Sequence, residues 1–205
     1  MLARGFSLLE LMVAMAIAAI LMMLAQPSFR QMVDNTKSKG AAESLLSGMR
    51  LARSEAIKRN APMRFQLVST FDNTCHHLAT SSLWVISQTD QLSYGLVEGK
   101  CDQAAALPSD PCDASCNGNP YIAYKSDGTS TVESSFTVLA DGAVVTFGPL
   151  GQITTNFDGA ATLSQVTVTP ANTAAKTWRV MVAAPSGSLK LCDTAVAAGQ
   201  PYSCA

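Results

Sequence analysis

The chain is poor in charged residues, and those present are nearly balanced in sign. Only 14% of its 205 residues are Asp, Glu, Lys or Arg, and the formal net charge is −1. Domains that bind nucleic acid through general phosphate neutralisation are strongly cationic. The composition therefore argues against that class of protein as a whole.

The short motifs of common enzyme classes are also missing. The chain has no nucleophile elbow, no glycine-rich phosphate loop and no HExxH motif. Its acidic residues are scattered, with no pair that the sequence places in a cleft. We therefore expect no catalytic residues, no cofactor and no enzymatic activity.

No cysteine precedes residue 75, although the chain contains six of them. They are Cys75, Cys101, Cys112, Cys116, Cys192 and Cys204. An even number in this part of the chain indicates disulfides formed in an oxidising compartment. The count alone leaves the pairing open. We expect Cys192 to pair with Cys204 in a short C-terminal loop, and the other four to pair among themselves.

A zinc site is the alternative use of these cysteines, because His76 and His77 follow Cys75 directly. However, CxxC pairs are absent, and the closest pair is Cys112 and Cys116, separated by three residues in a turn-rich region. Adjacent histidines on a strand would also face opposite ways. Disulfides and solvated histidines are therefore favoured, and we expect no metal site.

Residues 6–25 form an apolar stretch whose single charge is Glu10. A helix of about 20 residues spans about 30 Å, the hydrocarbon core of a bilayer. A plain membrane anchor does not explain Glu10, because a carboxylate there costs a few kcal/mol unless it is shallow or paired. An ordinary secretory signal also fits poorly, because Met23 sits three residues before the likeliest cut, after Ala25.

The segment MLARG followed by FSLLELMVAMAIAAILMMLA resembles a class III (prepilin) signal. The resemblance implies that residues 1–5 are a leader, which a prepilin peptidase removes between Gly5 and Phe6. Phe6 would then be N-methylated. Glu10 would pair with the terminal amine of an adjacent subunit.

The resemblance further makes residues 6–26 a transmembrane and filament-core helix, with Pro27 where pilins carry a helix-kinking proline. Basic residues flanking the span argue for the opposite orientation, because Arg4 precedes it while Arg30, Lys37 and Lys39 follow it. The cysteines and the leader outweigh that bias. We expect a single-pass inner-membrane protein with a periplasmic C-terminal head.

Residues 27–60 are predicted to continue the helix as an amphipathic stem. Their apolar stripe consists of Ala42, Leu45, Leu46, Met49, Ala52 and Ala56. Asn60 and Pro62 end the pattern. The string LARSEAIKRN, Leu51 to Asn60, resembles the end of the stem helix in GspH/FimT-type pseudopilins, and the resemblance returns over Trp178 to Asp193.

Residues 61–205 are predicted to form a β-rich head. The strand-forming strings are MRFQLVS, LWVISQ, SSFTVLA, AVVTFG, SQVTVTP and TWRVMVA. Asp141-Gly142 and Asp158-Gly159 are typical of hairpin turns. Residues 100–120 have no periodicity and predict a long loop insertion. The expected fold is α+β: a long N-terminal helix packed on an antiparallel β-rich head, as in type IV pilins.

This family resemblance implies a minor pilin of a type IV pilus, acting in assembly or priming with other pilins. The alternative is the minor, H-type pseudopilin of a type II secretion system. DNA uptake is a further alternative, because some FimT-type pilins bind DNA through a C-terminal Gly-Arg-x-Arg motif. The equivalent stretch here is Gly187-Ser188-Leu189-Lys190, so both arginines are replaced. Lys176, Arg179 and Lys190 are the candidate DNA contacts, and the expected binding is weak.

The leader predicts a specific mature N-terminus. Mass spectrometry of protein from the native host should find a chain that begins at methylated Phe6. Gly5→Arg should leave the leader attached, because the peptidase needs a small residue before the cut. A mature chain beginning near Gln26 would contradict this and indicate an ordinary signal peptide.

Overall fold

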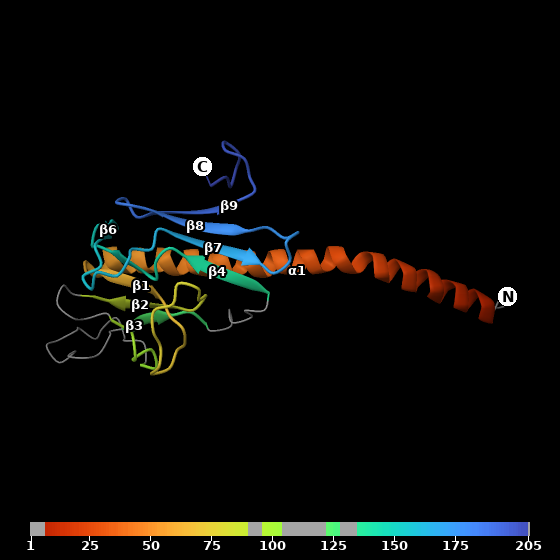
Figure 1. Ribbon diagram of the computed structural model, residues 1–205, viewed down its shortest axis with the longest axis horizontal. Coiled ribbons are helices and arrows are strands. Elements are labelled where there is room, and N and C mark those ends of the chain that lie inside the picture. Colours follow the sequence, from red (N-terminus) through yellow and green to blue (C-terminus); the bar gives the residue numbers. More distant parts are fainter. Residues whose placement is uncertain (1–6, 90–95, 104–121, 128–134, 205) are drawn as a thin grey trace, which may run out of the picture.

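A single long helix and two antiparallel sheets make up the protein in the computed structural model. The structure describes residues 7–89, 96–103, 122–127 and 135–204, with the backbone alone at residues 24–28. Figure 1 shows the head gathered around the C-terminal half of the helix, while the N-terminal half projects away from it. The predicted α+β class is confirmed.

Helix α1 spans Leu8–Arg59, 52 residues or about 80 Å. Ser7 caps its start, because the Ser7 side chain accepts a hydrogen bond of 3.2 Å from the Glu10 N–H. Asn60 ends the helix in the left-handed conformation, with φ of 50°. The helix runs through residue 27 without interruption. A kink at Pro27 therefore stays a prediction.

The first sheet has five strands in the order β3-β2-β1-β5-β6. Its strands are β1 (Met63–Leu67), β2 (Trp84–Gln88), β3 (Ile122–Lys125), β5 (Val144–Phe147) and β6 (Ile153–Thr154). The second sheet has four strands in the order β4-β7-β8-β9. Its strands are β4 (Phe136–Ala140), β7 (Gln165–Pro170), β8 (Trp178–Ala183) and β9 (Ser188–Asp193). All six predicted strands are present, and β3, β6 and β9 are additional.

The two predicted hairpin turns do not connect hairpins. Asp141-Gly142 carries the chain from β4 in the second sheet to β5 in the first, and Asp158-Gly159 lies on the return from β6 to β7. The Asp141 carboxylate accepts hydrogen bonds from the N–H groups of Ser164 and Gln165 at the start of β7. These turns are therefore crossovers between sheets, and the hairpin prediction is wrong.

The predicted apolar stripe of the stem is the core-facing side of α1. Leu45, Met49 and Ala52 are fully buried among inward side chains from both sheets, such as Phe65 of β1 and Val180 of β8. Gly48 lets the first sheet approach closely, because a Cβ there would lie 2.8 Å from ring atoms of both Phe65 and Trp84. The stem and the head thus share one core.

A buried polar layer lies on β1. Arg64 is completely buried, and its Nη2 donates a 2.7 Å hydrogen bond to Asp158 Oδ2. Burial works to raise the pKa of Asp158, but the hydrogen bond from Arg64 holds it below its ordinary value. His77 Nε2 lies 2.9 Å from Gln66 Oε1. Burial lowers the pKa of His77, so the neutral ring is the form that this layer accommodates.

Arg53 of the stem holds two loops against the helix. Its Nε donates to the carbonyl of Gly151 at 2.9 Å, and its Nη2 donates to the carbonyl of Ser186 at 3.3 Å. Nearby, Glu55 is buried and accepts a 2.7 Å hydrogen bond from Arg59. Burial opposes ionisation of Glu55, but this bond still holds its pKa below the ordinary value. Arg53 of the LARSEAIKRN string therefore fastens the head to its stem, whereas the Glu55–Arg59 pair lies within the helix.

Gly187 follows the Ser186 loop and has a positive φ of 67°. A Cβ there would lie 2.2 Å from the Gly151 carbonyl oxygen, so no other residue fits without moving the backbone. The glycine of the sequence Gly187-Ser188-Leu189-Lys190 thus has a packing role in the turn between β8 and β9.

Two disulfides lie within the described residues. Cys192 is bonded to Cys204, the predicted pair, and closes the C-terminal loop against β9. Cys75 is bonded to Cys101, which ties two loops of the head together and agrees with the expectation for the remaining cysteines. Cys112 and Cys116 lie outside the described residues, as does most of the predicted insertion at 100–120.

Gly187→Ala should destabilise the protein by about 2–4 kcal/mol, because it adds a backbone clash to the strain of positive φ. Gly159→Ala is the matched control, since Gly159 has φ of 72° but open space around its Cβ position. That control should cost only about 1 kcal/mol. Chemical unfolding of both variants measures the difference, and equal losses would contradict the packing role.

Removing the C-terminal disulfide with Cys192→Ala and Cys204→Ala should lower the free energy of unfolding by about 3 kcal/mol, because the unfolded chain gains loop entropy. Denaturant titration of the oxidised proteins measures this change. Free thiols at both positions in protein from the oxidising compartment would contradict the pairing.

Candidate functional site

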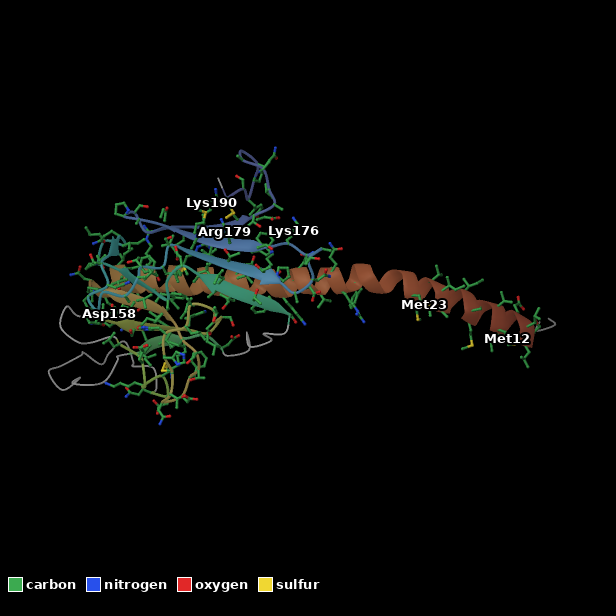
Figure 2. The ribbon with its side chains drawn as sticks, in the orientation of Figure 1. Met12, Met23, Asp158, Lys176, Arg179 and Lys190 are labelled. Atoms are coloured by element: carbon green, nitrogen blue, oxygen red, sulfur yellow. A yellow bond between two sulfur atoms is a disulfide. The ribbon has the colours of Figure 1, made fainter. Side chains whose placement is uncertain are left out.

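The projecting half of α1 carries a continuous apolar surface that its own head does not cover. Its large exposed side chains are Leu8, Leu9, Leu11, Met12, Val13, Met15, Ile17, Ile20, Leu21, Met22 and Met23. Each is at least 52% exposed, and Figure 2 shows Met12 and Met23 standing far from the head. Exposed apolar surface of this extent marks contact with another protein or with lipid.

Among the residues that the structure describes, no helix combines the length and the apolarity that a membrane crossing requires.

Glu10 is the one charge on the described part of this surface, and it lies in the first turn of α1. There its carboxylate is favoured by the positive end of the helix dipole. Over residues 7–89, 96–103, 122–127 and 135–204, no cation forms an ion pair with it. Gly5 and Phe6, the predicted cleavage and methylation residues, lie outside the described residues.

Two of the three candidate DNA contacts share one face of the second sheet. Arg179 on β8 and Lys190 on β9 both project from the outer face, because Lys190 pairs with Met181, two residues from Arg179. Lys176 precedes β8, and its Nζ lies 3.1 Å from Asp193 Oδ2. Figure 2 shows Lys176 set apart from the other two. The structure thus brings Arg179 and Lys190 to one face and places Lys176 beside Asp193.

The charge of Arg179 is partly committed to the sheet itself. Its Nε donates a 3.3 Å hydrogen bond to Thr167 Oγ1 on β7. Serine replaces arginine at position 188, and glycine at 187 is required by the turn. The outer face is therefore a weakly cationic surface. The register of β8 with β9 determines which basic side chains lie on it.

The two adjacent histidines have different surroundings. His76 Nδ1 lies 3.1 Å from Ser69 Oγ, whereas His77 faces Gln66 and Glu98. The described part of the chain contains no cluster of three or more His, Cys, Asp or Glu residues that could hold a metal ion. The two side chains thus point to different partners, as neighbouring residues of an extended chain do.

Sequence reasoning missed the structural importance of Arg53. No signal in the composition identifies it, although it belongs to the LARSEAIKRN string. It faces two loops that carry Gly151 and Gly187 at positive φ, and this placement is visible only in the folded chain.

Comparison with known families agrees with this architecture. The family model of the type II transport protein GspH matches residues 41–187, which covers the C-terminal part of the stem and most of the head. The model of the prokaryotic N-terminal methylation motif matches residues 1–25, the leader and apolar helix. No curated protein and no solved structure matches the chain. A helix half covered by an antiparallel head, with these two matches, shows that the chain belongs to the GspH family of type IV pilin-like proteins.

Proposed function

We propose that this pilin-like protein is a minor pilin of a type IV pilus, which primes or caps the filament. The observation that supports the proposal is the division of α1 into two halves. The head buries one half, while Leu8–Met23 leaves its apolar side chains exposed. A filament of parallel subunits would cover that half with the corresponding helices of its neighbours.

Assembly would begin with processing of the leader. A prepilin peptidase cuts after Gly5, and the new N-terminus at Phe6 is methylated. Glu10 then pairs with the terminal amine of the adjacent subunit. A carboxylate in an apolar bundle is costly unless it is paired, so this contact would fix the position of each incoming helix. The role of the protein is assembly with other pilins, without catalysis or a cofactor.

Before assembly, residues 6–26 would span the inner membrane, with the head in the periplasm. The Cys75–Cys101 and Cys192–Cys204 disulfides support an oxidising location for the head. The exposed apolar side chains between Leu8 and Met23 support burial of this half in lipid.

The second candidate is the H-type pseudopilin of a type II secretion system. It is favoured by the description of the matched family, a type II transport protein. Both functions use the same fold and the same processing, so the experiment has to distinguish the type IV pilus from the type II secretion system. Deleting the gene and measuring piliation, secretion and transformation in parallel does so. Loss of pili with normal secretion supports the pilus, and the reverse result supports the secretion system.

Glu10→Ala should keep the protein in the membrane but lower its incorporation into filaments at least tenfold, because the neighbouring amine loses its carboxylate. Asp34→Ala is a matched control, since Asp34 is an acidic residue on the same helix beyond the apolar half. Quantitative immunoblotting of sheared filaments and membranes measures both pools. Normal incorporation of the Glu10→Ala protein would show that Glu10 is not the docking group.

Any role in DNA uptake would be weak, because affinity without sequence preference depends on the number of phosphates neutralised. Of the three candidate contacts, Arg179 and Lys190 lie on the outer face of the sheet, and Lys176 lies apart from them beside Asp193. So few contacts predict a shallow salt dependence and binding near or below the usual non-specific range of about 10⁻⁴–10⁻⁶ M.

Ser188→Arg combined with Lys190→Arg should strengthen binding to duplex DNA, because both side chains project from the exposed face of β9 and arginine binds phosphate in a bidentate manner. Fluorescence anisotropy over a salt series measures the affinity and its slope. Tight binding by the unsubstituted protein at physiological salt, abolished by Lys190→Ala, would instead make DNA capture the leading function.

A further inference from the structure

A pocket of about 650 Å³ lies on the face of the first sheet that points away from α1. Its lining includes Thr146 of β5 and Thr154 of β6, which are directly opposite each other in the sheet. Arg64 of β1 is directly opposite Thr146 on its other side. Directly opposite residues project from the same face of a sheet, so these three side chains form one polar row that leads into the pocket.

Two hydrogen-bond donors of the buried Arg64 side chain have no acceptor within the described residues. Its Nη2 donates to Asp158, but its Nε and Nη1 are unpartnered. The neighbouring Thr146, by contrast, donates a 2.8 Å hydrogen bond to Asn156 Oδ1. A buried donor has lost its bond to water, and without a new acceptor that loss is not compensated. Arg64 therefore retains donors for an acceptor that this part of the chain does not supply.

Phe157 links Arg64 to the pocket. The centroid of its ring lies 4.9 Å from Arg64 Cζ, and the same side chain lines the pocket. Phe157 is only partly buried, and side chains with exposed surface change rotamer within nanoseconds. A rotamer change of Phe157 would open the guanidinium to a ligand in the pocket.

The charges around the pocket favour an uncharged ligand. The Asp158 carboxylate lies 2.7 Å from Arg64 Nη2 and neutralises the guanidinium. No charged side chain is among the described residues that line the pocket. An anionic ligand would therefore be repelled by Asp158 without a free cation to offset the repulsion. The unpartnered donors of Arg64 suit a neutral oxygen, such as a hydroxyl or an amide carbonyl.

The lining combines polar groups with apolar surface. Gln152 Oε1 accepts the Leu150 N–H at 3.0 Å, whereas Gln152 Nε2 and the hydroxyl of the exposed Thr155 form no hydrogen bond within the described residues. Phe157 and Pro149 contribute apolar surface. A sugar ring has the matching chemistry, because its hydroxyls lie around the rim and its C–H groups form an apolar face that packs on an aromatic ring.

We propose that this pocket binds an uncharged saccharide. Gln152 and Thr155 hold its hydroxyls, Phe157 packs against its apolar face, and Arg64 donates to one of its oxygens. Figure 2 shows Asp158, the neighbour of Phe157, at the end of the molecule opposite Met12 and Met23. The pocket is thus far from the apolar half of α1, and saccharide binding does not depend on the proposed assembly.

The test uses the full-length protein in a detergent without a sugar headgroup. Saturation-transfer NMR and titration calorimetry are performed with maltotriose and chitotriose as uncharged probes, and with trigalacturonic acid as a charged probe. At least one uncharged trisaccharide should bind more tightly than the acid, with a Kd that does not change as salt is added. Absence of binding by both uncharged probes at millimolar concentration would overturn the proposal, and so would tighter binding of the acid.

Substitutions in the lining locate the binding. Gln152→Ala combined with Thr155→Val should raise the Kd about tenfold, because two hydrogen bonds to the saccharide are lost. Thr155→Val alone keeps the side-chain volume and should raise the Kd about threefold. Leu150→Ala is the matched control, since Leu150 is 85% exposed on the same loop and does not line the pocket. Equal Kd values for all of these proteins would show that the saccharide binds elsewhere and overturn the site.

The role of Arg64 has a readout of its own. Its Nε–H resonance can be identified by the contact of the guanidinium with the Phe157 ring. Binding of the trisaccharide should shift this resonance and slow its exchange with water, because the donor gains an acceptor. Binding with an unchanged Arg64 resonance would overturn the part assigned to Arg64.

Discussion

The architecture depends on one constraint: a single continuous helix has to satisfy two different surroundings. From Ala41 onward, the helix buries an apolar stripe against both sheets, and that half is complete within the subunit. From Leu8 to Met23 the helix has apolar side chains around its whole circumference and no covering layer. The subunit is therefore stable as a head on a stem but incomplete as an apolar surface, which makes association with lipid or with like helices a physical requirement.

The head is fixed rigidly to the stem, so it moves with the helix when the exposed half associates with lipid or with other helices. Arg53 binds two loop carbonyls, and the shared core includes strands from both sheets. Gly187 and Gly151 meet beside Arg53, so the turn between β8 and β9 is set by the helix. The strings that resemble GspH/FimT-type pseudopilins are thus the ones that join helix to head. The position of the stem therefore fixes the position of the outer face of β8 and β9.

Much of this could be read from the sequence, because it rests on local patterns. The helix from Leu8, its end at Asn60 and six strands follow from periodicity and turn residues. The bond between Cys192 and Cys204 was likewise expected, since they are close in the chain. The hairpin error has a non-local cause: Asp141-Gly142 signals a turn but not which sheet receives the next strand. The pairing of Lys176 with Asp193 also depends on tertiary placement, which no local pattern encodes.

The central claim is that the exposed half of α1 is covered by other subunits in a filament. Quantitative mass spectrometry of purified filaments from the native host, with and without its prepilin peptidase, tests it most directly. The account predicts the chain in filaments as the form beginning at Phe6, and its complete loss from them when the peptidase is deleted. Recovery of the chain only as a soluble protein outside filaments and membranes, unaffected by the peptidase, would contradict it.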